Sequence, residues 1–272
     1  MKLLLPIIIS PCQSCAVPGR STFANLMVTR DVFEYATLKR LSGAFPSLSQ
    51  AKAFHRVKHA YLLQVLREFG FPANFVDLVG LLYKNLTCHV VVNGSETPSF
   101  NYTRGIGQGC PLGLILFIMS IEPLLTSLTG DERIKGFPLM GRDEIKALAY
   151  ADDVSLFVRD AGSFSRFWST FNHYAEASEA EINVGKSRAL LFGSLPKEAI
   201  GKIATVDTVK VLGIYFSCSG VVEATWQKAV ERAHEVTARV RNLELTLQEK
   251  ALAVKTSICA FASYASRITA MP

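Results

Sequence analysis

Two adjacent carboxylates, Asp152 and Asp153, lie between two apolar runs at residues 147–150 and 154–158. Each run is about as long as a short buried strand. Because successive side chains of a strand point to opposite faces, neighbouring aspartates converge on one site only if the chain turns at them. Two like charges held together favour a cation between them, and carboxylate oxygens suit Mg²⁺. The pattern therefore predicts a hairpin with a magnesium site at its tip.

The alternative for this stretch is a solvated turn without function, because aspartate is a common turn residue. Polar flanks would favour that alternative. The flanks here are apolar, which indicates that the two acids are carried on strands of the core. We therefore favour the metal site.

The chain has 272 residues, of which 49% are hydrophobic and 19% charged. This composition is typical of a globular protein with a substantial core and excludes a disordered chain. The net charge of +6 and the isoelectric point near 9.0 favour a polyanionic partner. No apolar run reaches the ~18–20 residues that span a bilayer, so we expect no transmembrane segment and no membrane partner.

The six cysteines are far apart except for Cys12 and Cys15, which form a Cys-x-x-Cys pair. Such a pair is half of a zinc site, but no second Cys or His pair follows at the spacing that zinc requires. We expect free thiols and no zinc site. Residues 1–10 resemble a signal peptide superficially, but Pro6 interrupts their apolar core. We therefore expect an intracellular protein, nuclear or cytoplasmic.

Apolar periodicity predicts most of the elements that would support the acidic hairpin. Asn93-Gly94 is a strong signal for a two-residue hairpin turn. Pro46 is awkward inside a strand because proline has no N–H to donate. The predicted helices are residues 22–41, 59–69, 74–83, 112–128, 164–178 and the stretch from 226 to the end. The predicted strands are residues 44–49, 88–93, 97–104, 186–192 and 208–216.

Six short motifs occur along the chain in a fixed order: residues 15–21, 52–57, 107–112, 150–153, 183–187 and 209–213. They read Cys-Ala-Val-Pro-Gly-Arg-Ser, Lys-Ala-Phe-His-Arg-Val, Gly-Gln-Gly-Cys-Pro-Leu, Tyr-Ala-Asp-Asp, Asn-Val-Gly-Lys-Ser and Val-Lys-Val-Leu-Gly. Together they resemble the reverse transcriptase of non-LTR retrotransposons, the LINE-like elements. The resemblance covers essentially the whole chain.

This resemblance implies an α+β fold, the right-hand polymerase palm, with an antiparallel sheet, packed helices, partial fingers and the start of a thumb. The expected divisions are residues 1–42 for partial fingers and entry helices, 43–217 for the palm with its fingers helices, and 218–272 for a helical thumb or connection. The implied activity copies an RNA template onto a DNA primer from dNTPs with two Mg²⁺ ions. We expect no obligate protein partner.

The resemblance also implies roles for individual residues. Asp152 matches the invariant metal ligand of the hairpin, and Asp153 matches its companion. Phe54 matches the bulky residue beneath the incoming sugar. Gln108 and Gly109 match a turn that lets template and nucleotide approach the backbone. The remaining matches are Lys186 near the leaving pyrophosphate, Val211, Leu212 and Gly213 in the loop that grips the primer, and Arg20 in a template-side motif.

The chain departs from the family pattern at the third metal-binding carboxylate. The family has an aspartate three residues before the lysine of Lys-Ala-Phe, and here that position is Ser49. A second family aspartate is replaced by His55. A hydroxyl does not replace a carboxylate for Mg²⁺, so the loss is expected to cost several orders of magnitude in rate. The family also has an endonuclease domain and basic fingers strands before this region, which leads us to expect a truncated, catalytically impaired copy.

Three interpretations remain from the sequence. The chain is an active RNA-directed DNA polymerase that uses other ligands, a non-catalytic nucleic-acid-binding remnant with a basic groove, or the reading frame of a decayed element. Primer extension separates the first from the other two, and a salt titration of binding separates the second from the third.

Overall fold

A five-stranded sheet in the order β11-β10-β1-β9-β8 forms the centre of the molecule. The computed structural model describes residues 3–107, 109–139 and 142–270. All neighbouring strands are antiparallel except β10 and β11. The strands are β1 (Gly43–Leu48), β8 (Ala147–Tyr150), β9 (Asp153–Leu156), β10 (Arg188–Phe192) and β11 (Ala204–Thr205). The acidic pair therefore lies on a hairpin next to the central strand β1.

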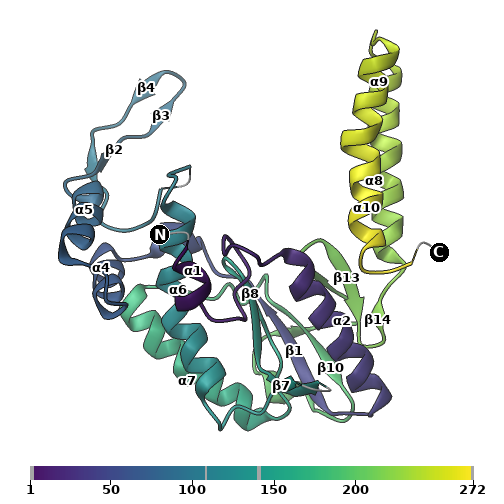
Figure 1. Ribbon diagram of the computed structural model, residues 1–272, viewed down its shortest axis with the longest axis horizontal. Coiled ribbons are helices and arrows are strands. Elements are labelled where there is room, and N and C mark those ends of the chain that lie inside the picture. The colour runs from purple at the N-terminus through teal and green to yellow at the C-terminus, as the bar shows by residue number, and fades with distance from the viewer. Residues whose placement is uncertain (1–2, 108, 140–141, 271–272) are drawn as a thin grey trace.

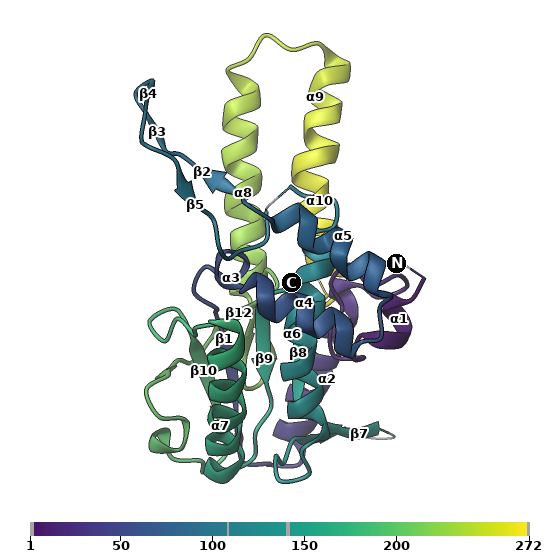
Figure 2. The same ribbon diagram turned by 90° about the vertical axis from the view of Figure 1, so that its left-hand side faces the viewer.

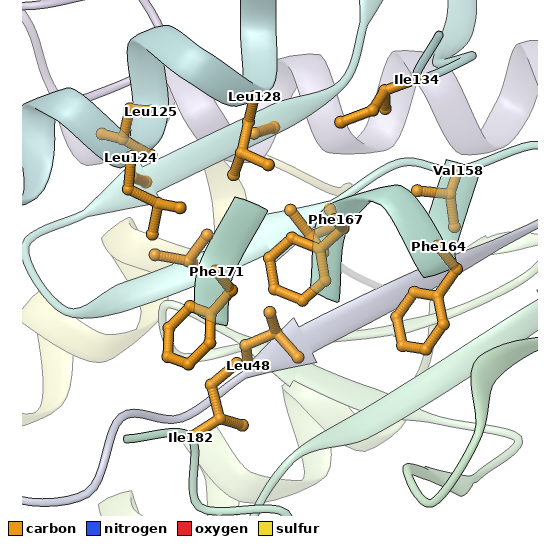
Figure 3. Close-up of a cluster of buried hydrophobic side chains, with 14 of the residues drawn as sticks. Leu48, Leu124, Leu125, Leu128, Ile134, Val158, Phe164, Phe167, Phe171 and Ile182 are labelled. Carbon is orange, nitrogen blue, oxygen red and sulfur yellow. The ribbon is translucent and has the colours of Figure 1, made fainter. Parts of the chain in front are cut away.

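Two helices, α6 (Gly113–Gly130) and α7 (Ala161–Ser178), cover one face of the sheet. In Figure 3 Phe167 and Phe171 of α7 lie beside Leu48 of β1. Phe167 and Phe171 are spaced four residues apart on α7 and are almost fully buried. The aromatic stripe of α7 thus belongs to the core, as its helical spacing indicates.

The other face of the sheet packs against α2 (Thr22–Leu38) and a small sheet of β12 (Val209–Val211), β13 (Ile214–Ser217) and β14 (Gly220–Val221). Phe33 of α2 lies at the centre of this cluster. Its ring meets Phe45 of β1 edge-on at 4.8 Å and Phe216 of β13 at 5.6 Å. This aromatic cluster ties the small sheet to the central sheet.

A third buried cluster lies beside the sheet and is built from short helices. It consists of side chains from α1 (Leu5–Ile8), α3 (Ala53–Arg56), α4 (His59–Glu68), α5 (Ala73–Tyr83) and the first half of α6. Helix α6 therefore belongs to two clusters. Among the described residues it is also the one helix long and apolar enough to cross a membrane, but 67% of that window is buried inside the protein.

Two arms project from the same side of the molecule, at opposite ends (Figures 1 and 2). One is a narrow β-arm of β2 (Thr87–Cys88), β3 (Val91–Val92), β4 (Ser95–Glu96) and β5 (Phe100–Asn101). The other is a helical arm of α8 (Ala224–Arg241), α9 (Leu247–Ala253), the π-helix η2 (Val254–Cys259) and α10 (Ala260–Ser266). The acidic hairpin lies in the palm between the two arms. The remaining elements are β6 (Phe137–Leu139), β7 (Arg142–Ile145) and η1 (Lys197–Ile200).

The five internal helices predicted from periodicity are confirmed, with their ends shifted by at most three residues. The prediction of one strand over residues 208–216 is wrong: β12 and β13 form a hairpin there, with a turn at Leu212 and Gly213. The predicted returning strand at 97–104 is reduced to β5, which pairs with β2, while β3 pairs with β4 nearer the turn. The stretch after residue 226 is helical but is interrupted between α8 and α9, where Thr246 and Glu249 form a capping box.

Pro46 lies in the central strand, where proline is rarely found. The ladder between β1 and β9 pairs Ser47 with Ser155 and Leu48 with Val154. It then lapses at Pro46 and resumes as an isolated bridge between Ala44 and Val158. Because Pro46 has no N–H, the ladder between β1 and β9 is interrupted there. The ladder between β1 and β10 continues through Pro46.

Candidate active site

The predicted acidic hairpin is present, formed by β8 and β9. Tyr150 pairs with Asp153, so the turn consists of Ala151 and Asp152. Ala151 has a φ of 53°, in the left-handed region that costs an L-residue about 1–2 kcal/mol. Asp152 is half-buried and Asp153 exposed. The chain does turn at the acids, so both carboxylates belong to the tip of the ribbon.

The end of β1 lies beside this tip. Leu48 pairs with Val154, and the next step of the same register places Ser49 opposite Asp153. The Ser49 N–H donates to the Ser187 hydroxyl at 3.1 Å, and its carbonyl accepts from the Asn183 N–H at 2.7 Å. A serine thus occupies the strand position next to the carboxylate pair.

The two carboxylates influence each other. The pKa of Asp153 is raised, first because neighbouring protein atoms displace water from the carboxyl and second because of the charge of Asp152. Asp153 is exposed at the same time, so water reaches it from the open side of the site. Within the described ranges no group of three or more His, Cys, Asp or Glu side chains is placed to hold a metal. The candidate donors are therefore the two carboxylates, with a serine in place of a third carboxylate at the neighbouring strand position. A neutral hydroxyl suits Mg²⁺ less well than a carboxylate.

The loop at residues 183–187, which carries Lys186, docks on Ser49 through the backbone contacts given above. The Ser187 hydroxyl also donates to the Asn183 carbonyl at 2.9 Å, which closes the loop on itself. Lys186 is exposed. The structure thus brings the lysine loop and the acidic hairpin to the same end of the central strand.

Phe54 lies on the one-turn helix α3, half-buried, with its ring stacked on Phe117 of α6 at 4.1 Å. The Phe54 carbonyl accepts the N–H of Ile106 at 2.7 Å, and the Val57 carbonyl accepts that of Gly105 at 2.8 Å. These bonds join the Phe54 segment to the stretch that precedes the predicted Gln-Gly turn. Gly109 of that turn is exposed with a φ of 92°, while Gln108 lies outside the described residues.

The β12–β13 hairpin that contains Val211, Leu212 and Gly213 lies against the acidic hairpin. A small cavity is lined from one side by Tyr150, Asp153 and Ser155 and from the other by Lys210 and Leu212. The Leu212 carbonyl accepts the hydroxyl of Tyr264 from α10 at 2.5 Å. The predicted primer-gripping turn is therefore adjacent to the acidic turn at Ala151 and Asp152 and in contact with the helical arm.

Arg20 makes contacts that its predicted template role does not include. Its guanidinium donates to the carbonyls of Ser10 at 2.5 Å and Gln13 at 2.8 Å, and to those of Ile9 at 2.8 Å and Pro6 at 3.2 Å. It thereby gathers the backbone of residues 6–13 around one side chain. A contact of Arg20 with template stays a prediction.

Three residues of this neighbourhood have no counterpart among the residues selected from the sequence. They are Gln13, Asn25 and Tyr264. The Asn25 side-chain amide donates to the Ala149 carbonyl at 2.9 Å, and Gln13 contacts the Ala151 backbone. The sequence signals near Gln13 are the Cys12–Cys15 pair, which directs attention to the thiols, and the motif at residues 15–21, which begins after Gln13. Both thiols are buried and free, and desolvation raises the pKa of Cys12 to about 12.

A mostly antiparallel sheet with two helices on one face, whose edge hairpin carries paired carboxylates between two arms, is the arrangement of a nucleic-acid polymerase palm. The chain belongs to the reverse transcriptase family: the model of the family described as reverse transcriptase (RNA-dependent DNA polymerase) matches residues 3–216. The resemblance inferred from the six motifs is thereby confirmed.

Relatives from transposable elements agree with this assignment. A 149 kDa protein of transposon TX1 from Xenopus laevis is 39% identical over 223 residues, which cover 80% of this chain and 17% of that protein. A Pol polyprotein of a type-1 retrotransposable element R2 from Popillia japonica is 28% identical over 240 residues, covering 82% of this chain and 38% of the polyprotein. The chain is a reverse transcriptase domain of the non-LTR retrotransposon type, and it spans less than half the length of these relatives.

Solved structures share the fold at low sequence identity. Telomerase from Candida tropicalis in complex with a fragment of telomeric RNA superposes with a TM-score of 0.52 and 14% identity, covering 75% of this chain and 33% of telomerase. The apo form of telomerase from Candida tropicalis gives a TM-score of 0.51 with 11% identity, covering 75% of this chain and 36% of telomerase. The predicted palm with fingers helices is confirmed as the fold.

Proposed function

We propose that this chain is an RNA-directed DNA polymerase domain whose own nucleotidyl transfer is impaired. The observation that carries the proposal is the register of β1 and β9, from which Ser49 faces Asp153 where the family has a third metal-binding carboxylate. Residues 43–217 would act as the palm, residues 1–42 as fingers and entry helices, and residues 218–272 as the thumb. We propose an intracellular site of action, nuclear or cytoplasmic.

In this proposal Asp152 and Asp153 hold divalent metal, which when bound supplies charge stabilisation to the attacking and leaving oxygens of the transferred phosphoryl group. Ser49 adds a neutral hydroxyl in place of a negative charge. Phe54 excludes a 2′-hydroxyl by contact, and exposed Lys186 neutralises the departing pyrophosphate. The protein's part is positioning and electrostatics, so one missing charge is expected to lower the rate by several orders of magnitude.

The proposed partners are an RNA template, a DNA primer and dNTPs. The net charge of +6 supports a polyanionic partner. The acidic hairpin lies between the two arms (Figure 1), and this is where we propose that the duplex binds.

Primer extension with the purified full chain on an RNA template tests the impairment directly. We expect little or no extension with Mg²⁺ or Mn²⁺, and no difference between the natural chain and Asp152→Ala. Measurable extension that disappears in Asp152→Ala contradicts the proposal, because it means that the two carboxylates suffice.

Restoring the missing charge tests the role of Ser49. We expect Ser49→Asp to bind Mn²⁺ more tightly than the natural chain, because a third carboxylate joins the site. We expect this variant alone not to restore robust DNA synthesis. Ser194→Asp, at an exposed position beyond the far end of β10, serves as the matched control. Robust synthesis by Ser49→Asp contradicts the second expectation, and unchanged Mn²⁺ affinity contradicts the first.

A second candidate function is nucleic-acid binding without catalysis, favoured by the same missing charge and by the basic net charge. Binding to an RNA–DNA hybrid should then weaken steeply with salt, because each neutralised phosphate releases counterions. A fluorescence titration between about 50 and 200 mM salt measures this slope. Affinity that does not change with salt contradicts the second candidate function. The remaining interpretation is then that the chain is the reading frame of a decayed element.

A further inference from the structure

We propose that Gln13 is a positioning residue that fixes the backbone of the acidic turn. Gln13 is far from the hairpin in sequence and is completely buried, with an exposed fraction of 0%. The proposal rests on the proposed function in one respect only, namely that Asp152 and Asp153 bind a divalent cation.

The carboxamide of Gln13 contacts both polar backbone groups of Ala151. Its Oε1 accepts the Ala151 N–H at 3.0 Å, and its Nε2 donates to the Ala151 carbonyl at 3.3 Å. Ala151 is the first of the two turn residues and immediately precedes Asp152. One side chain thus holds the N–H and the carbonyl of the peptide units on either side of Ala151.

The turn needs such support because Ala151 is not a glycine. A φ of 53° is unfavourable for an alanine by about 1–2 kcal/mol, and a two-residue turn without compensation would relax toward another conformation. The two hydrogen bonds to Gln13 favour the observed conformation. Any rotation of the Ala151 peptide units would also break both bonds and leave the buried Nε2 of Gln13 without a partner among the described residues, at a cost of about 1–3 kcal/mol.

The segment that carries Gln13 is attached along the edge of the same hairpin. Gln13 forms a parallel bridge with Ala149 of β8, in which the Ser14 N–H donates to the Ala149 carbonyl at 3.0 Å and the Ala149 N–H donates to the Cys12 carbonyl at 2.8 Å. The outer edge of β8 is therefore paired with backbone, and the side chain of Gln13 reaches the turn from this fixed point.

Gln13 is itself held in place by its neighbours. Its Oε1 also accepts the Cys15 N–H at 3.0 Å, and its backbone carbonyl accepts the Arg20 guanidinium at 2.8 Å. Arg20 also holds the Ser10 carbonyl, and the Ser10 N–H donates to the buried carboxylate of Glu122 on α6 at 2.7 Å. A continuous series of hydrogen bonds thus connects the core helix α6 to the turn beside Asp152.

Groups that orient metal ligands in this indirect way commonly contribute 10- to 100-fold to metal affinity. We therefore expect Gln13→Met, which keeps the volume but removes both bonds to Ala151, to weaken Mn²⁺ binding to the free full chain about tenfold. Titration followed by electron paramagnetic resonance measures this affinity without nucleic acid and without turnover.

Backbone amide exchange supplies the readout that distinguishes positioning from general destabilisation. In Gln13→Met the Ala151 amide should exchange at least about tenfold faster, because its acceptor is lost. The amides of Phe45 and Leu190, in the β1–β10 ladder, should change far less. Gln13→Glu keeps an acceptor for the Ala151 N–H and should retain most of the protection there. Gln64→Met, at an exposed position of α4, is the matched control.

Two results would overturn the proposal: unchanged Ala151 exchange in Gln13→Met, or faster exchange with unchanged Mn²⁺ affinity. If Gln13→Met does not fold, Gln13→Glu decides, because loss of Ala151 protection in a folded Gln13→Glu chain equally contradicts it. None of these measurements uses polymerase activity or nucleic acid. A negative result in primer extension and hybrid binding therefore does not affect the proposal for Gln13. Likewise, unchanged amide exchange in Gln13→Met does not affect the proposed polymerase function.

Discussion

Two tight turns meet at the centre of this molecule, and they are supported in different ways. The acidic turn has Ala151 at a φ of 53°, and the β12–β13 turn, which we call the primer-side turn after its proposed role, has Leu212 at 46° followed by Gly213 at 92°. The first is held on both backbone groups by a buried glutamine, and the second on one carbonyl by Tyr264. Both turns therefore place a non-glycine residue in a strained conformation and compensate it from a distant segment.

The difference lies in what the supporting side chain is attached to. Gln13 belongs to a segment bonded to β8 and, through Arg20 and Ser10, to the core helix α6. Tyr264 belongs to the helical arm, whose helix α9 has no buried residue at all. The acidic turn is thus fixed to the palm core, whereas the primer-side turn is connected to an arm that projects from it.

The largest expected effect comes from a β-branched residue placed in each strained turn. Ala151→Val should lower the free energy of unfolding by roughly 2–4 kcal/mol, because the site is buried and the left-handed conformation is least tolerated by β-branched side chains. Leu212→Val, at a half-buried site, should cost only about 1–2 kcal/mol. Urea unfolding of both variants measures the difference. Equal losses of unfolding free energy in the two variants would contradict the inference that the acidic turn is held more firmly than the primer-side turn.

Arg20→Gln should have the next largest effect. Removing donors from four backbone carbonyls should lower the free energy of unfolding by about 2–3 kcal/mol. We expect the salt dependence of binding to an RNA–DNA hybrid to stay the same. If Arg20 instead contacts a template phosphate, the slope of log K against log salt falls by about 0.7–0.9, the contribution of one phosphate.

Tyr264→Phe should have a smaller and more local effect. Loss of one hydrogen bond to the Leu212 carbonyl should cost about 0.5–1.5 kcal/mol. Amide exchange should increase in β12 and β13 and remain unchanged at Ala151. Tyr215→Phe is the control, because its hydroxyl makes no hydrogen bond to the described part of the protein. Faster exchange at Ala151 in Tyr264→Phe would mean that the two turns are coupled.

The smallest effect concerns the pH dependence of stability in the metal-free protein. Because the pKa of Asp153 is raised from its ordinary value of 3.8, the folded state binds this proton more tightly than the unfolded state. The contribution of Asp153 to stability is therefore present at low pH and is lost as the pH rises through its folded-state pKa. Glu122 acts in the same direction, since burial raises its pKa too.

Asp153→Asn separates the contribution of Asp153 to the pH dependence of stability from that of Glu122. Urea midpoints across a pH series should fall less steeply with rising pH in this variant than in the natural chain. Added Mg²⁺ should reverse the trend in the natural chain, because bound metal favours the ionised carboxylate. Identical pH profiles in the two chains would contradict a desolvated Asp153.

Much of the fold follows from local sequence patterns. The helices of the palm are recognised by their 3.6-residue apolar period, and the acidic hairpin by apolar runs on both sides of Asp152 and Asp153. The single strand predicted over residues 208–216 is wrong because β12 and β13 are both apolar, and their turn contains Leu212 rather than a second glycine. Tertiary support from Tyr264 makes that turn possible, and nothing near Leu212 in the sequence indicates it.

The site shows the same division. The types and order of its residues, including the serine at position 49, are present in the sequence alone. That Ser49 faces Asp153 depends on the register between strands more than 100 residues apart, and that Gln13 holds Ala151 depends on a contact across 138 residues.

The sequence by itself determined which chemical groups this protein has and which short segments become helix, strand or turn, because those preferences act between neighbours along the chain. Only the tertiary structure decided which of these groups face one another and which strained turns are tolerated. Those outcomes depend on packing and hydrogen bonds between distant segments, and such contacts leave no local pattern to detect.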